Sequence, residues 1–189
     1  PVDGITGVNT LFNALIHEPS AKHLPFDKLK IVLAGGMAVQ KSVAEKWYNM
    51  TGVPIVEAYG LTEASPAVCI HRFDRTNFDG SIGLPVPGTQ LRIVGEEGED
   101  VPIGEVGELW VKGPQVMQGY WRNQEQTAHV LRDGWLQTGD LASINDEGLV
   151  FIVDRKKDII IVSGFNVYPN EVEDVLVMHP DISECAVVG

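Results

Sequence analysis

The chain has 189 residues, 44% of them hydrophobic, and a mean hydropathy of +0.02. This composition is typical of a globular protein with a substantial core, and the length allows one domain or two small ones. Acidic residues outnumber basic ones by 26 to 14, which gives a net charge of −12 and an isoelectric point near 4.7. So acidic a chain lacks the basic surface expected of a nucleic-acid-binding protein, although backbone N–H groups and a few local cations suffice for a nucleotide site.

Other classes are excluded by pattern. The two cysteines, Cys69 and Cys185, lie beside apolar residues, which is typical of reduced thiols in a cytosolic protein. No apolar run approaches the ~18 residues of a membrane-spanning helix, so any membrane contact is expected to be peripheral. The five histidines show no zinc-ligand spacing and no serine lies in a G-x-S-x-G elbow, which argues against a zinc enzyme and a serine hydrolase.

The first third of the sequence alternates helical and strand patterns. Apolar spacing predicts a helix over residues 8–19, a buried strand over 28–36, a helix over 39–52 that Gly52 ends, and a second strand over 53–60. Strand, helix and strand at this spacing predict a βαβ unit with a parallel sheet.

After Pro87 the pattern changes to short β runs separated by turn residues. The runs cover residues 89–94, 107–113 and 149–155, and they predict an antiparallel barrel or sandwich element. One helix is predicted over residues 123–134, with Asn123 as its N-cap.

The charged run "DRKKD" at residues 154–158 reads as a solvated turn or as a hinge between domains. A strand over 158–164 and a helix over 168–180 are predicted to follow, with Pro169 in the first turn of that helix. The predicted domains are residues 1–88, 89–154 and 155–189. Pro1 in place of methionine and a final strand-like "ISECAVVG" indicate a piece of a longer protein.

Four short motifs carry chemical groups. "AGGM" places Gly36 between a strand and a helix, where a bare backbone approaches a ligand closely, but it matches no phosphate-loop pattern. In "EAYGLTE", Tyr59 offers a face for stacking on a base, Thr62 a hydroxyl for phosphate and Glu63 a hard oxygen ligand for Mg²⁺. The alternative for this stretch is a packed tyrosine and a surface acid.

The two remaining motifs lie further along the chain. In "QTGD", the carboxylate of Asp140 suits a ribose diol, although an aspartate beside glycine is more often a turn residue. In "VDRKKDIIIVSG", the planar fork of Arg155 suits ribose or phosphate, and Ser163 and Gly164 offer bare backbone that a ligand can pass.

These motifs, in this order and together with "GELWVKGPQVMQGYW" and "SGFNVYPNEVED", resemble the adenylate-forming enzymes, which include acyl-CoA synthetases, luciferases and nonribosomal-peptide adenylation domains. The resemblance covers nearly the whole chain and is strongest to bacterial long-chain fatty-acyl-CoA synthetases. It implies an α/β fold: the C-terminal part of a large AMP-binding domain with a parallel sheet, an antiparallel β-barrel subdomain, and the start of a small α+β domain.

The resemblance also implies roles for individual residues. The residues implied to bind ATP or AMP are Gly36, Met37, Tyr59, Thr62, Asp140 and Arg155. Thr62 and Glu63 are implied to be catalytic, with Glu63 holding Mg²⁺. Ala58 and Gly60 are implied to line the acyl channel, Lys157 to be the hinge, and Ser163 and Gly164 to lie along the coenzyme A path. The implied ligands are fatty acid, ATP, Mg²⁺ and coenzyme A, with no nucleic acid; a homodimer, a cytoplasmic location and peripheral contact with the inner membrane are compatible with the family.

The implied reaction joins a fatty acid to coenzyme A through an acyl-adenylate. The family's Ser/Thr/Gly-rich phosphate loop and its C-terminal catalytic lysine are not among these residues, so the piece alone is expected to be inactive. Two alternatives stay open: a ligase of the same family for another carboxylic acid, and a non-catalytic fragment that binds nucleotide weakly or only pairs with itself.

Overall fold

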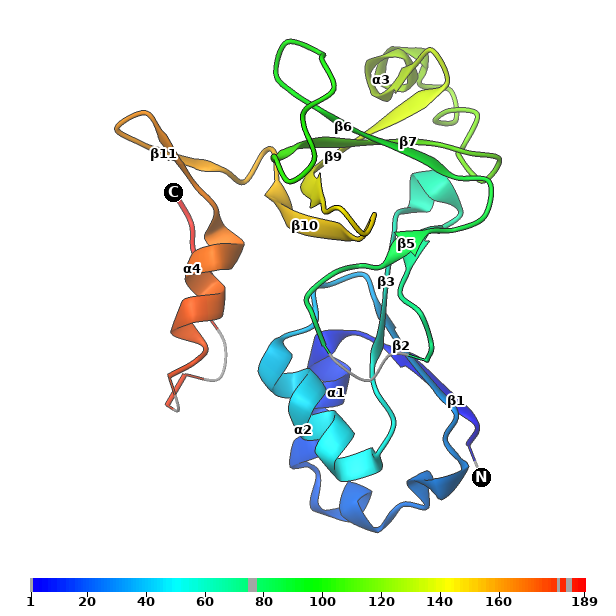
Figure 1. Cartoon of the computed structure of the whole chain (residues 1–189), viewed down its shortest axis with the longest axis vertical. Helices are drawn as coiled ribbons and strands as arrows, with labels where there is room; N and C mark the ends of the chain where they lie inside the picture. The colour runs from blue at the N-terminus through cyan, green and yellow to red at the C-terminus, as the bar shows by residue number, and fades with distance from the viewer. Residues whose placement is uncertain (1, 75–77, 180, 183–184) are drawn as a thin grey trace. The chain divides into compact units, whose positions relative to one another are not determined.

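The structure, a computed structural model, describes residues 2–74, 78–179, 181–182 and 185–189. Contacts between residues divide the chain into two compact units, Pro1–Pro87 and Gly88–Gly189, and each unit is described by itself. Figure 1 shows the elements of both. The predicted division into three domains stays a prediction.

The first unit contains a five-stranded sheet with the order β1-β2-β3-β4-β5. Strands β1, β2 and β3 are parallel to one another, whereas β4 and β5 add antiparallel pairs at one edge. The predicted parallel βαβ unit is therefore confirmed, with β1 as a further parallel strand. The elements are β1 (Gly4–Gly7), α1 (Asn9–His17), two 3₁₀ turns (Pro19–His23 and Phe26–Lys28), β2 (Ile31–Gly35), α2 (Lys41–Thr51), β3 (Val56–Gly60), the 3₁₀ turn η3 (Thr62–Ala64), β4 (Ala67–Ile70) and β5 (Leu84–Pro85).

An aromatic cluster joins the helices of this unit to its sheet. The fully buried rings of Phe12 and Trp47 meet edge to face with centroids 5.1 Å apart, and Phe26 meets Trp47 at 5.8 Å. Val32 and Ala34 of β2 belong to the same core. Helices α1 and α2 lie side by side (Figure 1) and bury their apolar faces in this cluster, which fixes the strands whose ends carry the candidate site.

The second unit is built on a curled antiparallel sheet with the order β10-β9-β7-β6, and β8 pairs with β9 (Figure 1). Its elements are β6 (Gln90–Val94), β7 (Gly107–Lys112), α3 (Gln124–Val130), β8 (Leu131–Arg132), β9 (Trp135–Ile144), β10 (Val150–Arg155), β11 (Ile160–Val162), β12 (Phe165–Val167) and α4 (Pro169–Leu176). Fully buried side chains fill its core: Leu109, Val111, Leu136, Ala142 and Val150. The predicted antiparallel barrel element is confirmed.

The helix predicted over 123–134 is too long. Asn123 caps it as expected, accepting a hydrogen bond from the Gln126 N–H at 3.1 Å, but the helix ends at Val130. The next residues form β8, which pairs with the start of β9 across the two-residue turn at Asp133, whose φ is 53°, and Gly134. Asp-Gly is a strong signal for such a hairpin turn, and here it ends the helix.

The C-terminal elements also differ in part from expectation. Asp154 and Arg155 of the charged run belong to β10, and the turn begins at Lys156. The strand predicted over 158–164 is only β11, which forms a hairpin with β12. Helix α4 begins at Pro169 as predicted but ends at Leu176, before the expected end at Pro180, which lies outside the described residues.

The strand expected over 182–189 is wrong for the residues that the structure describes. Residues 185–189 form no ladder, because the Val187 N–H donates to the Glu173 side chain at 2.7 Å instead of to a neighbouring strand. None of the helices in the described part of the chain has both the length and the apolar character to span a membrane.

Candidate functional site

The "YGLTE" residues form a short closed loop at the end of β3, here called the 59–63 loop. The Leu61 N–H donates to the Pro66 carbonyl at 3.0 Å and the Ala64 N–H to the Leu61 carbonyl at 2.9 Å, so the chain turns back at once into β4. A Cβ on Gly60 would collide with the Pro66 carbonyl oxygen, which explains why this position carries no side chain. The loop is therefore fixed by backbone packing, with Ala64 fully buried as its anchor.

The loop presents three different groups. Tyr59, the last residue but one of β3, is half-buried, the Thr62 side chain is exposed, and Glu63 is half-buried in the 3₁₀ turn. The described residues contain no group of three or more His, Cys, Asp or Glu side chains that would hold a metal ion by themselves. A single carboxylate such as Glu63 nevertheless fits Mg²⁺, which is commonly held by one or two carboxylates together with substrate phosphates.

The "AGGM" turn lies at the same edge of the sheet. Strands β2 and β3 are parallel neighbours, with Gly35 opposite Ala58, so the residues that follow each strand emerge side by side. Gly36 has a φ of 83°, and the side chain of Met37 is 57% exposed. The structure thus brings Gly36 and Met37 to the edge that carries the 59–63 loop, with the small Ala58 between Gly35 and Ile70 in the ladder.

In the second unit, Asp140 lies on a bulge in β9. Glu108 pairs with Leu141 and Trp110 with Gln137, so Leu109 alone faces the three residues 138–140. We call these three residues the 138–140 bulge. An aspartate beside glycine is more often a turn residue, but β9 continues through these residues to Ile144. Bulges often re-aim a side chain beside a functional site, and this one carries the candidate ribose ligand.

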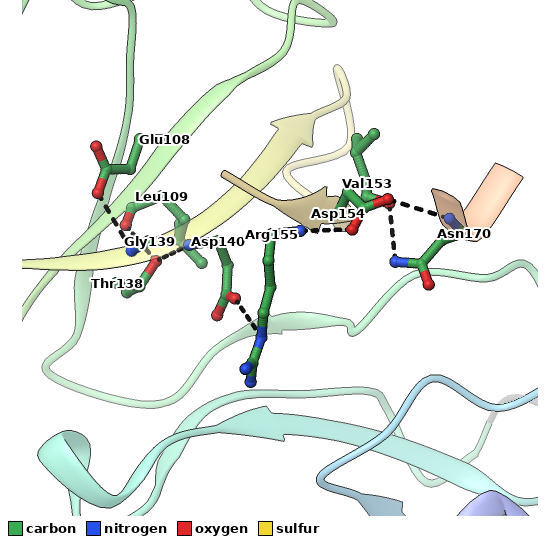
Figure 2. Close-up of polar contacts among 9 residues, drawn as sticks. All are labelled: Glu108, Leu109, Thr138, Gly139, Asp140, Val153, Asp154, Arg155 and Asn170. Atoms are coloured by element: carbon green, nitrogen blue, oxygen red, sulfur yellow. Dashed lines mark hydrogen bonds and ion pairs between the residues drawn. The ribbon is translucent and has the colours of Figure 1, made fainter. Parts of the chain in front are cut away.

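Side chains replace the ladder hydrogen bonds that the bulge interrupts (Figure 2). The Thr138 hydroxyl donates to the Leu109 carbonyl at 2.7 Å and accepts from the Asp140 N–H at 3.1 Å. The Gly139 N–H donates to Glu108 Oε1 at 3.2 Å, and Gly139 itself has a φ of 74°. The bulge is therefore a defined shape and not a frayed segment of strand.

Arg155 and Asp140 are cross-strand neighbours in β10 and β9. Their side chains approach to 3.4 Å between Nε and Oδ1; the Asp140 side chain is 15% exposed and that of Arg155 is 64% exposed. An anionic carboxylate with an exposed guanidinium beside it presents acceptors for hydroxyl groups and a donor fork for a ribose or phosphate oxygen. The structure brings these two predicted ligands together.

The remaining predicted residues lie further along the second unit. Lys157 is exposed in the turn that follows β10, where the Asp158 N–H donates to the Arg155 carbonyl at 2.9 Å. Ser163 and Gly164 form the exposed turn between β11 and β12, both with positive φ. The structure does not bring these three residues into contact with Asp140, and their hinge and coenzyme A roles stay predictions.

Two carboxylates in the second unit escaped the sequence reasoning, one partly buried and one buried. Glu108, on β7, binds the bulge as described above. Asp154, only 3% exposed, accepts from the Arg155 N–H at 2.7 Å and from the Asn170 N–H at 3.1 Å, and so caps the first turn of α4 (Figure 2). Each acid lies in an apolar strand run, and this was the available signal.

A buried acid of the first unit, Glu57, lines a cavity of about 350 Å³. Burial raises the pKa of this carboxyl to about 8. A hydrogen bond from the backbone of Val39 opposes the shift, and the negative charge of Asp79 adds to it. His71 lies 3.5 Å from Asp79, whose carboxylate also accepts from the Ser81 N–H and hydroxyl. Two residues before Tyr59, β3 therefore carries an acid whose burial favours the protonated form.

Comparison with known proteins agrees with this geometry. Residues 1–121 match the AMP-binding enzyme family. The whole chain is 54% identical to the long-chain-fatty-acid–CoA ligase of Yersinia pestis and spans about a third (34%) of the length of that relative. The chain belongs to the AMP-binding enzyme family.

Solved structures of ligases share the fold. An anthranilate–CoA ligase in complex with anthranoyl-AMP matches 99% of the chain with a TM-score of 0.91 at 29% identity, the match covering 36% of that protein. An O-succinylbenzoate–coenzyme A synthetase from Bacillus subtilis, in complex with ATP and a magnesium ion, matches the whole chain with a TM-score of 0.88 at 32% identity, covering 39% of its length. The predicted fold class and family are thus confirmed.

Proposed function

We propose that this chain is the middle-to-late part of a long-chain-fatty-acid–CoA ligase, and that it supplies the base, ribose and metal contacts of the ATP site. The observation that carries the proposal is the 54% identity to such a ligase along all 189 residues. The ordered motifs at the end of β3 and on β9 and β10 support it. In the full-length protein the fatty carboxylate oxygen attacks the α-phosphorus of ATP, forming the acyl-adenylate and releasing pyrophosphate.

In the second half of the reaction the coenzyme A thiolate attacks the adenylate carbonyl. A thioester forms, the bond to the phosphate oxygen breaks and AMP leaves. The chemistry is mostly positioning and charge neutralisation, and the side chains described above serve the positioning. Tyr59 stacks on adenine, Thr62 donates to a phosphate oxygen, and Asp140 accepts from the ribose hydroxyls with Arg155 beside it.

Glu63 would hold Mg²⁺ together with the phosphates. The cation supplies neutralisation of the negative charge that develops on the phosphate oxygens. Support comes from the single half-buried carboxylate on a rigid turn and from the ATP and magnesium ion in the related synthetase. Gly36 and Met37 would border the adenine, and Ala58 and Gly60 would leave room for the acyl chain.

Kinetics of the full-length protein with a panel of acids test the substrate. We expect kcat/KM to be highest for long-chain fatty acids and to fall by at least about tenfold for short-chain or aryl acids, because each buried CH₂ contributes about 0.8 kcal/mol. A preference for an aryl or short acid would refute the long-chain assignment and leave the adenylate-forming class intact. A failure to form any AMP from ATP, acid and coenzyme A would refute the class of reaction.

We also propose a cytoplasmic protein with peripheral contact to the inner membrane, because the substrate is a lipid. Fractionation of cells into soluble, salt-washed and integral membrane pools tests this location. Recovery only after detergent extraction would contradict it.

A further inference from the structure

The strongest unassigned feature is Glu108, a partly buried acid to which the sequence assigned no role and which binds the segment that carries a predicted ligand. Its side chain is 12% exposed and uses both oxygens. Oε1 accepts from the Gly139 N–H at 3.2 Å, and Oε2 accepts from Lys156 Nζ at 3.0 Å. The backbone N–H of Lys156 also donates a hydrogen bond to the Gly139 carbonyl at 2.9 Å.

These contacts join the two strands that carry the ribose ligands to a third. Asp140 follows Gly139 on β9, and Arg155, the last residue of β10, precedes Lys156, so Glu108 binds the immediate neighbour of each. Glu108 lies on β7, which pairs with β9 on the side opposite to β10. Without it, the Gly139 N–H would lose its acceptor at the point where the ladder is interrupted.

We propose that Glu108 is a positioning residue, holding the 138–140 bulge and the end of β10 in the arrangement that directs Asp140 and Arg155 toward the ribose of ATP. This assignment rests on the proposed function, because Asp140 has a ribose to bind only in an adenylate-forming ligase. The side-chain amide of Glu108→Gln keeps an acceptor for Gly139 but loses the charge that faces Lys156. The variant Glu108→Ala loses both contacts.

The experiment compares ATP with 2′,3′-dideoxyadenosine triphosphate as substrates of the full-length ligase, using the ratio of their kcat/KM values. This ratio isolates the ribose hydroxyls, and a general loss of folded enzyme does not change it. Asp140→Ala is expected to lower the ratio by about 10- to 100-fold. Glu108→Ala is expected to lower it by at least about tenfold, because small displacements of a positioning group are costly, while Glu108→Gln retains most of the preference.

Glu105→Ala, an exposed acid before β7, is the matched control and is expected to leave the ratio unchanged. Hydrogen exchange of the peptide that contains residues 136–142 gives a second measurement for variants too unstable to assay. It is expected to speed up in Glu108→Ala and not in Glu105→Ala.

The outcomes separate the two hypotheses. If Asp140→Ala leaves the ratio unchanged, the ribose assignment in the proposed function is wrong. If Asp140→Ala lowers the ratio and Glu108→Ala does not, or if exchange at residues 136–142 is unaltered in Glu108→Ala, only the positioning role of Glu108 is overturned.

Discussion

The 59–63 loop and the 138–140 bulge present ligand groups in two different ways. The loop is held almost entirely by main chain: a turn closed by two backbone hydrogen bonds around a glycine that packs against a carbonyl. The bulge is held by side chains, with Thr138 and Glu108 taking the place of missing ladder bonds. The first region should therefore respond most to changes of shape, and the second to the loss of single polar groups.

The largest effect is expected for Glu63→Ala in the full-length ligase. Loss of the only carboxylate in the loop removes the proposed cation ligand, which is worth several kcal/mol, so adenylate formation should fall by about 100-fold or more. ATP–pyrophosphate exchange measures this step directly. Glu63→Gln, which keeps the shape of the side chain, should be nearly as impaired, and normal exchange in either variant would remove Glu63 from the metal role.

The next largest effect is expected for Asp140→Ala, which removes the proposed ribose ligand from the 138–140 bulge. Losing a charge-assisted hydrogen-bond pair costs roughly 1.5–3 kcal/mol, so the KM for ATP should rise about 10- to 100-fold. Asp140→Asn keeps one acceptor and should lie between the wild type and Asp140→Ala. An unchanged KM for ATP in steady-state assays would count against ribose binding by this residue.

Two glycine substitutions compare the regions directly. In Gly60→Ala the new methyl group meets the Pro66 carbonyl, and the loop must shift at a cost of about 1–3 kcal/mol in unfolding free energy. In Gly139→Ala the space is open, and the cost of about 1–2 kcal/mol comes from the φ of 74° alone. Urea unfolding measures both. Asn tolerates such a φ, so Gly139→Asn should recover stability while Gly60→Asn should not; equal recovery would refute the distinction.

The last prediction concerns the pH dependence that the buried Glu57 before the loop confers. Its pKa is raised to about 8 in the folded chain, so the folded state binds the extra proton. Its contribution to stability is complete below the unfolded pKa of about 4.5 and is lost as pH rises toward 8, with a slope of at most about 1.4 kcal/mol per pH unit. Unfolding free energies at several pH values should show this decline.

Glu57→Gln should flatten that decline, because the amide does not ionise. The exposed Glu45, which lines the same cavity, provides the control: Glu45→Gln should keep the wild-type slope. An unaltered slope in Glu57→Gln would show that Glu57 does not govern the pH dependence.

Local patterns predicted the elements well where pattern and packing agree. The apolar spacing around Phe12 and Trp47 predicted both helices of the first unit, and the apolar run before Gly35 predicted strand β2. The bulge was different, because Thr138, Gly139 and Asp140 have the composition of a turn; only the buried Ala142 beyond them shows that the strand continues. The helix at Gln124 was extended too far, because the hairpin signal of Asp133 was read as helix.

The roles of Glu108 and Asp154 could not have been predicted, because each depends on a partner from a distant segment. Glu108 meets Gly139 across a gap of 31 residues, and Asp154 meets Asn170 across 16. A single sequence shows that an acid is misplaced in an apolar run, but it does not show which backbone N–H group it satisfies.

The count of residues in the 138–140 bulge has a consequence for insertions and deletions. From Glu108 to Trp110, β7 advances two residues while β9 advances four, and this even excess keeps the alternation of side chains in phase. Leu136 before the bulge and Ala142 after it therefore both reach the core. Deleting one residue would exchange the core-facing and solvent-facing side chains on one side of the bulge. Deleting two would leave a regular strand with its packing intact and no bulge to carry the aspartate, so the sheet can in principle exist without the site.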